Sequence, residues 1–189
     1  MRLLIDQDEV LAQFTARILE WWNQDHPNQK PVVVEDIGNY WLEQTLGERA
    51  AYFIKACMRY PDFFTNLEPI PGAIEGMKTL HDEGHELIIA TKCPTSAGIA
   101  FHGKIAWMRK HLPFVDVDNF VAIQRKDLLI GDVLLDDSPS NIKLFQKMGR
   151  AVVIFDRPWN RDLPGLRAKN WGEFIQMVRS TVRVGGMFR

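Results

Sequence analysis

Two pairs of carboxylates follow short apolar segments of the sequence. Asp6 and Asp8 come directly after Leu-Leu-Ile, and Asp136 and Asp137 come directly after Val-Leu-Leu. A carboxylate can attack phosphorus to form an aspartyl-phosphate, and a second one can donate and accept protons. Four acids gathered in a water-poor cleft require a cation, and oxygen ligands of this type suit Mg²⁺. The acids therefore indicate metal-assisted phosphoryl transfer.

Other polar residues follow two further apolar segments. Thr91 and Lys92 come after Glu-Leu-Ile-Ile-Ala, and Lys126 comes shortly after Asn-Phe-Val-Ala-Ile. In an open parallel sheet, ligands bind beyond the carboxyl ends of the strands, so we expect these residues to lie near the acids. A hydroxyl, a lysine and backbone N–H groups are the donors that neutralise phosphate oxygens during phosphoryl transfer.

Some charged residues near these segments are expected to lie outside the site. Asp132 precedes the strand that ends in Asp136, and four residues of strand place it roughly 13 Å away, at the opposite edge. The side chains of Lys92 and Lys104 are interpreted as peripheral. The segment "DRPWNR", residues 156–161, is different: it follows the last predicted strand and is a candidate for lining the cleft, although no firm role is assigned to it.

The elements that must position these residues alternate between strands and helices. Near-continuous apolar runs predict strands that are covered on both faces, at residues 3–5, 87–90, 120–123, 133–135 and 151–155. Apolar residues at helical spacing predict the intervening helices, at residues 73–80, 105–112, 142–148 and 171–178. The alternation predicts an α/β fold, a Rossmann-like parallel sheet with helices on both faces.

The segment between the first predicted strand and the turn "EPIPG" differs from the rest. It is rich in aromatic residues with helical spacing, and residues 32–34 (Val-Val-Val) are its one weak strand candidate. We interpret residues 15–68 as a small helical cap inserted after the first strand. Residues 1–14 and 69–189 would then form the catalytic core.

Composition and charge exclude several classes of protein. The chain has 189 residues and a net charge of −1, so neither nucleic-acid polymers nor anionic membranes are expected partners. Two cysteines make a disulfide framework unexpected and fit a reducing cytoplasm. The sequence has no recognisable signal peptide and no apolar run near the ~20 residues that a membrane span requires.

Four short motifs together resemble those of phosphatases of the haloacid dehalogenase (HAD) superfamily: "LLIDQDEV", "IIATK", Lys126 and "LLDDSP". Longer stretches narrow this resemblance to the 5'(3')-deoxyribonucleotidase family, and they cover most of the chain: "DQDEVLAQF", "YWLEQ", "FFTNLEPIPGA" and "KIAWMRKH". No single motif is specific. Their order, the spacing from Lys126 to Asp136 and the aromatic insertion carry the resemblance.

The resemblance implies a role for each matching residue. Asp6 would be the nucleophile and Asp8 the general acid and base. Mg²⁺ would be held by Asp6, the backbone carbonyl of Asp8, and Asp136, with Asp137 acting through water. Phosphate would bind to Thr91, the N–H of Lys92, and Lys126. The base of a nucleoside monophosphate would bind to aromatic residues of the first helix and the cap, namely Phe14, Tyr40, Trp41 and Phe64.

Two departures from the family pattern leave the substrate open. Lys92-Cys93-Pro94 follows Thr91 where relatives often have Ser-Pro, and Ser138 stands where some relatives have arginine. The first alternative is a HAD phosphatase for a sugar phosphate or another small metabolite. The second is a non-catalytic nucleotide-binding protein on the same scaffold. A phosphorylated receiver domain fits poorly because of the large insertion after the first strand. Oligomeric state is also open, with a homodimer as one alternative.

Overall fold

A six-stranded parallel sheet organises the computed structural model, which describes residues 1–94 and 98–183. The order across the sheet is β3-β2-β1-β4-β5-β6. Its strands are β1 Arg2–Ile5, β2 Glu86–Thr91, β3 Phe120–Ala122, β4 Val133–Asp136, β5 Val152–Phe155 and β6 Arg167–Ala168. The five predicted strands and the α/β fold class are therefore confirmed. The two-residue edge strand β6 has no apolar run and was not predicted.

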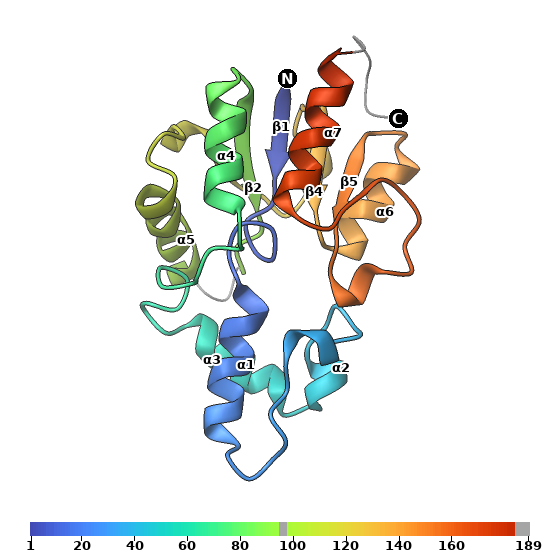
Figure 1. Ribbon diagram of the computed structural model, residues 1–189. Helices are drawn as coiled ribbons and strands as arrows, with labels where there is room; N and C mark the ends of the chain where they lie inside the picture. The colour runs from blue at the N-terminus through green and yellow to red at the C-terminus, as the bar shows by residue number, and fades with distance from the viewer. Residues whose placement is uncertain (95–97, 184–189) are drawn as a thin grey trace.

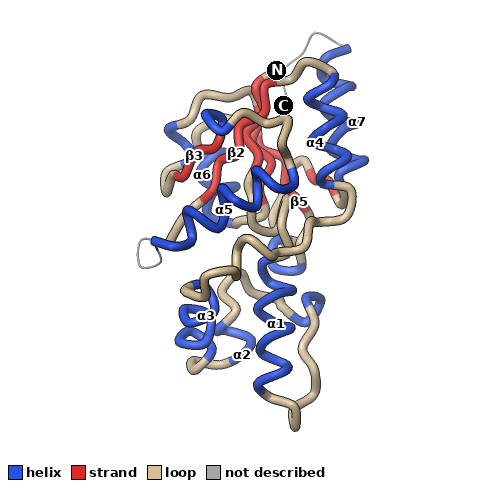
Figure 2. The backbone as a smooth tube through the Cα atoms, turned by 90° about the vertical axis from the view of Figure 1, so that its left-hand side faces the viewer, coloured by secondary structure: helices blue, strands red, loops and turns tan. Residues whose placement is uncertain are grey.

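Four helices cover the two faces of this sheet. They are α4 Ala73–Asp82, α5 Gly98–His111, α6 Pro139–Lys147 and α7 Trp171–Arg183, which correspond to the four predicted helices. Figures 1 and 2 show α4 and α7 side by side on one face of the sheet. The buried residues of α5 pack in the same hydrophobic cluster as those of α4 and α7, whereas those of α6 pack in a second cluster on the other face. The last residues assigned to the core, 184–189, lie outside the described residues, as do residues 95–97.

Alternation along β1 places its side chains in two hydrophobic clusters. Leu3 and Ile5 belong to the larger cluster, whereas Leu4 packs with Leu134 of β4 and Phe145 of α6 in the smaller one. Successive residues of a strand point to opposite faces, so a strand that is covered on both faces must be apolar throughout. Burial on both faces fixes β1 in the centre of the sheet and fixes where its carboxyl end emerges.

Three helices lie between β1 and α4, beyond the carboxyl ends of the strands (Figures 1 and 2). They are α1 Phe14–Asp25, α2 Glu43–Leu46 and α3 Ala50–Met58. The weak strand candidate at residues 32–34 was wrong, because Val34 begins the short 3-10 helix Val34–Asp36 instead. A β-branched run forms a strand only when a neighbouring strand can pair with it, and no strand of the described chain lies among these helices.

No helix among the described residues has both the length and the apolar character that crossing a membrane would require.

The packing of α4 against α7 predicts a large cost for Gly76→Ala. Alanine normally stabilises a helix interior by about 0.5–1 kcal/mol relative to glycine. A Cβ atom at Gly76, however, would lie 2.5 Å from Cε3 of the buried Trp171. We expect a net loss of about 1–3 kcal/mol in the free energy of unfolding, measured in urea. Gly98→Ala is the control, since a Cβ there meets no atom of the described residues within 4 Å. An equal loss in both variants would contradict the packing argument.

Candidate active site

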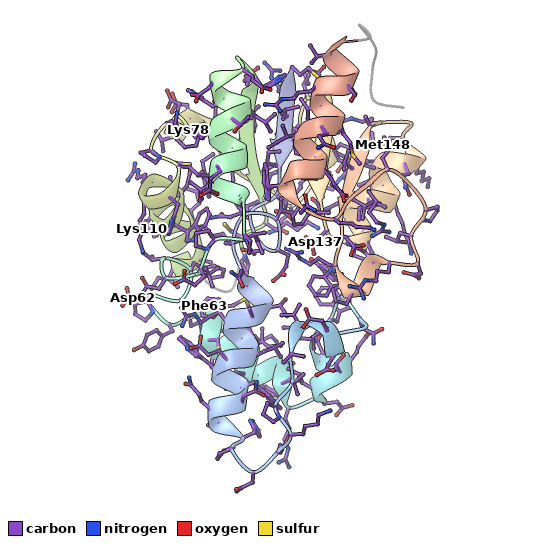
Figure 3. All side chains as sticks on the ribbon, in the orientation of Figure 1. Asp62, Phe63, Lys78, Lys110, Asp137 and Met148 are labelled. Atoms are coloured by element: carbon purple, nitrogen blue, oxygen red, sulfur yellow. The ribbon has the colours of Figure 1, made fainter. Side chains whose placement is uncertain are left out.

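The carboxyl ends of β1 and β4 bring three acids together. Asp6 follows β1, Asp136 ends β4, and Asp137 follows it; all three are buried. One carboxylate oxygen of each lies within 4.8 Å of the others. Figure 3 places Asp137 where the strands end and the helices α1–α3 begin. The two predicted carboxylate pairs thus meet at one edge of the sheet.

Lys126 lies between two of these acids. Its Nζ atom is 2.6 Å from Asp6 Oδ1 and 2.7 Å from Asp136 Oδ2, and its side chain is 1% exposed. Burial alone lowers the pKa of a lysine, but Asp136 and Asp6 outweigh this effect and raise it. Lys126 therefore carries a positive charge next to the carboxylate that would attack phosphorus.

Hydrogen bonds fix the orientation of Asp136. Its Oδ1 atom accepts from the backbone N–H of Ser138 at 2.8 Å, and its Oδ2 atom accepts from Asn141 Nδ2 at 2.9 Å. Ser138 precedes the first turn of α6, which begins with Pro139. The proline at this position ends the strand and starts the helix without losing an intrahelical hydrogen bond. The local sequence therefore sets both the position of Asp136 and its direction.

Electrostatics indicate that the three acids fit a divalent cation. Burial raises the pKa of Asp137 well above its usual value, and the charges of Asp136 and Asp6 raise it further. Burial raises the pKa of Asp136 as well, although Lys126 opposes this shift. Lys126 alone does not neutralise three buried carboxylates. A hard cation that prefers oxygen ligands, such as Mg²⁺, would supply the missing charge.

Asp8 turns away from the acid cluster toward a second lysine. Its Oδ2 atom accepts a 2.6 Å hydrogen bond from Lys104 Nζ, which also donates to Thr91 Oγ1 at 2.8 Å and to the carbonyl of Lys92 at 2.9 Å. Among the described residues, no group donates to the buried Oδ1 atom of Asp8. Burial raises the pKa of Asp8, and Lys104 opposes this shift. A carboxyl group with a raised pKa is suited to donate a proton.

The interpretation of Lys104 as peripheral was wrong. Its side chain is 1% exposed and links the first and second motifs. A sequence signal existed: Lys104 lies three and four residues before Trp107 and Met108, which are buried on the same face of α5. A lysine within an apolar helical stripe indicates a buried partner. Asp132, in contrast, lies at the opposite edge as predicted, where its Oδ2 atom accepts from the backbone N–H of Arg2.

A cavity of about 400 Å³ opens next to these acids, and its size is typical of a site for a small molecule. Met58 and Trp159 line it together with most of the predicted site residues. The predicted residues that line it are Asp6, Asp8, Phe14, Tyr40, Trp41, Phe64, Lys92 and Asp137. Phe14 stacks on Phe64 with ring centroids 6.1 Å apart, and Tyr40 packs edge-on against Trp41. The aromatic residues thus give the cavity an apolar wall beside the carboxylates.

The segment "DRPWNR" also contacts the site, in agreement with its place after the last predicted strand, although the individual contacts were not predicted. Trp159 Nε1 donates to Asp137 Oδ2 at 2.9 Å. Arg157 donates to the backbone carbonyl of Glu9, the residue after Asp8. Both side chains follow β5, whose carboxyl end lies at the same edge of the sheet as the carboxyl ends of β1 and β4.

Comparison with known proteins gives consistent matches along the chain. The family described as "5' nucleotidase, deoxy (Pyrimidine), cytosolic type C protein" matches residues 1–184. The human "5'(3')-deoxyribonucleotidase, cytosolic type" is 28% identical over 202 aligned residues, which cover 97% of each chain. A relative from Bordetella bronchiseptica is 29% identical over 174 residues, 90% of this chain and 93% of the relative.

A solved structure extends the comparison to the fold. A HAD family hydrolase from Deinococcus radiodurans R1, crystallised with bound phosphate and sodium, superposes with a TM-score of 0.62. The alignment covers 96% of both chains at 13% sequence identity. At this identity the superposition shows that the two proteins share the HAD fold.

Proposed function

The chain belongs to the family of cytosolic type C 5'-nucleotidases acting on deoxy (pyrimidine) nucleotides, within the HAD superfamily, and from this premise we propose its reaction and the residues that perform it. It is a nucleotidase, a phosphoric monoester hydrolase. We propose that it dephosphorylates deoxyribonucleoside monophosphates in a Mg²⁺-dependent reaction through an aspartyl-phosphate on Asp6.

One observation carries this proposal. The buried acids Asp6, Asp136 and Asp137 gather around Lys126 at the mouth of an aromatic-lined cavity of about 400 Å³. The acids and the lysine suit phosphoryl transfer, and the aromatic wall suits the flat base of a nucleoside. A sugar phosphate would leave this apolar wall without a partner.

The proposed reaction has two steps that use this chain's own residues. Asp6 attacks phosphorus, and Asp8 protonates the oxygen of the leaving sugar. Asp8 then takes a proton from the water that hydrolyses the aspartyl-phosphate. Lys126 and the backbone N–H of Lys92 hold phosphate oxygens. Thr91 Oγ1 accepts from Lys104, so its own O–H remains to donate to the phosphate.

The donor set suits Mg²⁺ as the cofactor. We propose that Asp6, the backbone carbonyl of Asp8, and Asp136 would hold it, with Asp137 contacting it through water. When bound, Mg²⁺ would neutralise charge on the phosphate oxygens. The carboxylate of Asp8 is engaged by Lys104, which agrees with a role in proton transfer and leaves its backbone carbonyl as the ligand.

The substrate side of the cavity is proposed to come from residues 15–68 acting as a cap, with Phe14 at its border. Phe14, Phe64, Tyr40 and Trp41 would contact the base and sugar. Trp41 is 59% exposed and lies at the rim, so it would become covered when a nucleotide enters. Closure of such a cap would exclude bulk water from the reacting phosphate.

The chain's family and its low cysteine content also support a cytoplasmic location. A small nucleotide is the proposed partner.

Release of inorganic phosphate from a panel of phosphomonoesters tests this function. We expect Mg²⁺-dependent release from dUMP and dTMP, and loss of that release in EDTA. The panel includes the corresponding ribonucleotides, the 3'-phosphates and several sugar phosphates, because Lys92 and Ser138 depart from the family pattern. Release from sugar phosphates alone would support the proposed phosphatase chemistry and would exclude nucleotides as the substrate. Release from no substrate, with nucleotide still bound, would indicate a binding protein.

A further inference from the structure

The loop after β5, residues 156–161, contacts two separate parts of the site through neighbouring side chains. It contains the short 3-10 helix Pro158–Asn160. Trp159 reaches the acid that follows β4, whereas Arg157 reaches the segment that follows β1. None of the roles proposed above uses either residue, although both contacts are made close to the reacting groups.

Trp159 and Asn160 hold Asp137 from two sides. Trp159 is 7% exposed, and its Nε1 atom donates to Asp137 Oδ2 at 2.9 Å. Asn160 is fully buried, and its Nδ2 atom donates to the backbone carbonyls of Asp137 and Phe155 at 2.9 and 3.0 Å. The amide of Asn160 fixes the main chain of Asp137, and the indole fixes its carboxylate. Without the indole N–H, this carboxylate would be free to rotate.

Arg157 holds the turn that follows Asp8. Its guanidinium donates to the backbone carbonyl of Glu9, and its Nε atom lies 3.4 Å from Glu9 Oε2. Glu9 has a φ of 62°, a left-handed conformation that is unusual outside glycine. The other carboxylate oxygen of Glu9 accepts from the backbone N–H of Thr15 in the first turn of α1. Arg157 therefore stabilises the turn that joins the catalytic segment to α1.

The loop itself is held in one conformation. Asn160 Oδ1 accepts from the backbone N–H of Arg157 at 3.1 Å and from Arg167 at 2.8 Å. Arg167 also pairs with Asp156 at 2.8 Å and donates to the backbone carbonyls of Asn160 and Leu163. A support that orients catalytic groups must be rigid, and these bonds provide that rigidity.

We propose that the loop after β5 is a positioning element for the Mg²⁺ site, in which Trp159 orients Asp137 and Arg157 fixes the segment that carries Asp6 and Asp8. This inference rests on the proposed function. Residues that hydrogen-bond to metal ligands tune the affinity for the metal, and their loss typically costs 10–100-fold. The proposal has two parts, which we call its first and second arm. In the first arm Trp159 contacts a metal-facing acid, so its loss should change the Mg²⁺ affinity. In the second arm Arg157 contacts the backbone next to the proton donor, so its loss should change kcat.

Trp159→Phe tests the first arm, since phenylalanine keeps an aromatic ring toward the cavity and lacks the N–H donor. We expect Mg²⁺ binding, measured by titration calorimetry of the nucleotide-free protein, to weaken about 10-fold, the lower end of that range, because Asp137 is proposed to contact the metal through water. Trp107→Phe is the matched control. It removes an indole N–H bond of the same kind, to the carbonyl of Leu67, away from the acids. It should lower stability and leave the Mg²⁺ affinity unchanged.

Arg157→Lys tests the second arm and serves if the Trp159 variant fails to fold. Lysine keeps the charge but cannot contact both the carbonyl and the carboxylate of Glu9. We expect kcat to fall about 10-fold or more at saturating Mg²⁺ with KM within threefold, because a displaced proton donor slows the chemical step. Arg161→Lys, in the same loop but 61% exposed, is the control and should keep the wild-type kcat.

The outcomes separate this inference from the proposed function. Mg²⁺ affinity within twofold of wild type in Trp159→Phe would overturn the first arm, and an unchanged kcat in Arg157→Lys would overturn the second. If the wild-type protein neither binds Mg²⁺ nor releases phosphate from any nucleotide, the proposed function itself fails. A wild-type enzyme that is active and Mg²⁺-dependent, with variants that are unaffected, would reject only the positioning role.

Discussion

Asp6→Asn is expected to lower kcat for phosphate release at least ~10³-fold, the scale of loss that follows removal of a catalytic nucleophile. An amide cannot form the aspartyl-phosphate, whereas its size and its oxygen acceptor remain close to those of Asp6. The substitution also removes one of three crowded buried carboxylates. The substitution breaks the ion pair between Asp6 and Lys126, but it also relieves the like-charge repulsion by which Asp6 raises the pKa values of Asp136 and Asp137, so the two effects offset each other. We therefore expect the free energy of unfolding to stay within ~1 kcal/mol of wild type.

Steady-state hydrolysis of dUMP and urea unfolding in EDTA would be measured on the same preparations. Asp132→Asn is the matched control, since Asp132 lies at the opposite edge of the sheet and contacts the backbone of Arg2. It should keep the wild-type kcat. If Asp6→Asn retained more than a tenth of the activity, Asp6 could not be the nucleophile. A parallel loss of stability and activity would indicate damage to the fold instead of removal of the reacting group.

The sequence predicted the acids better than the groups that hold them. Asp6 follows, and Asp136 ends, a strand that contains three consecutive buried apolar residues, and this pattern does not depend on how the helices pack. The parallel arrangement then places both acids at one edge. Apolar runs and the rule for strand ends are therefore sufficient to predict that Asp6, Asp136 and Asp137 lie close together.

Residues that reach the site from helices and loops were harder to predict. Lys104 lies in the middle of α5, 12 residues after Lys92, and only the angle at which the helix docks brings its Nζ atom to Asp8. Trp159 and Arg157 lie on a loop whose path depends on the bonds that Arg167 makes. The ends of strands can be predicted from two-residue alternation and from runs of buried apolar residues. The docking angle of a helix and the path of a loop depend on tertiary contacts that a sequence pattern does not encode.

The edges of the elements show the same limit. β6 consists of Arg167 and Ala168, which form no apolar run. These two residues are a strand only because they pair with the neighbouring strand β5. Residues 32–34 are β-branched yet form no strand, because no strand of the described residues lies among the helices around them. Propensity is decisive only where tertiary pairing supports it.

Lys104→Met should destabilise the protein and slow catalysis, which would establish the pairing that the sequence did not reveal. Methionine preserves the length of the buried stem, so the packing of α5 is retained. Asp8 would lose its only side-chain donor among the described residues. Breaking a fully buried ion pair costs about 3–5 kcal/mol, and we expect ~2 kcal/mol here because the Asp8 side chain is 30% exposed. We expect kcat to fall ~10²-fold, since Asp8 and Thr91 both lose a contact that orients them.

A double-mutant cycle identifies the cause of the lost stability. Asp8→Asn with Lys104→Met removes both charges, and replacing both partners of a buried pair costs much less than removing one. The double variant should therefore be more stable in urea than Lys104→Met alone. Lys78→Met is the control for loss of a lysine, because its pair with Asp82 is exposed and exposed ion pairs contribute little to stability. If the double variant were no more stable than Lys104→Met, the lost bonds to Thr91 and the carbonyl of Lys92 would account for the destabilisation, and Asp8 would not depend on Lys104 for its charge.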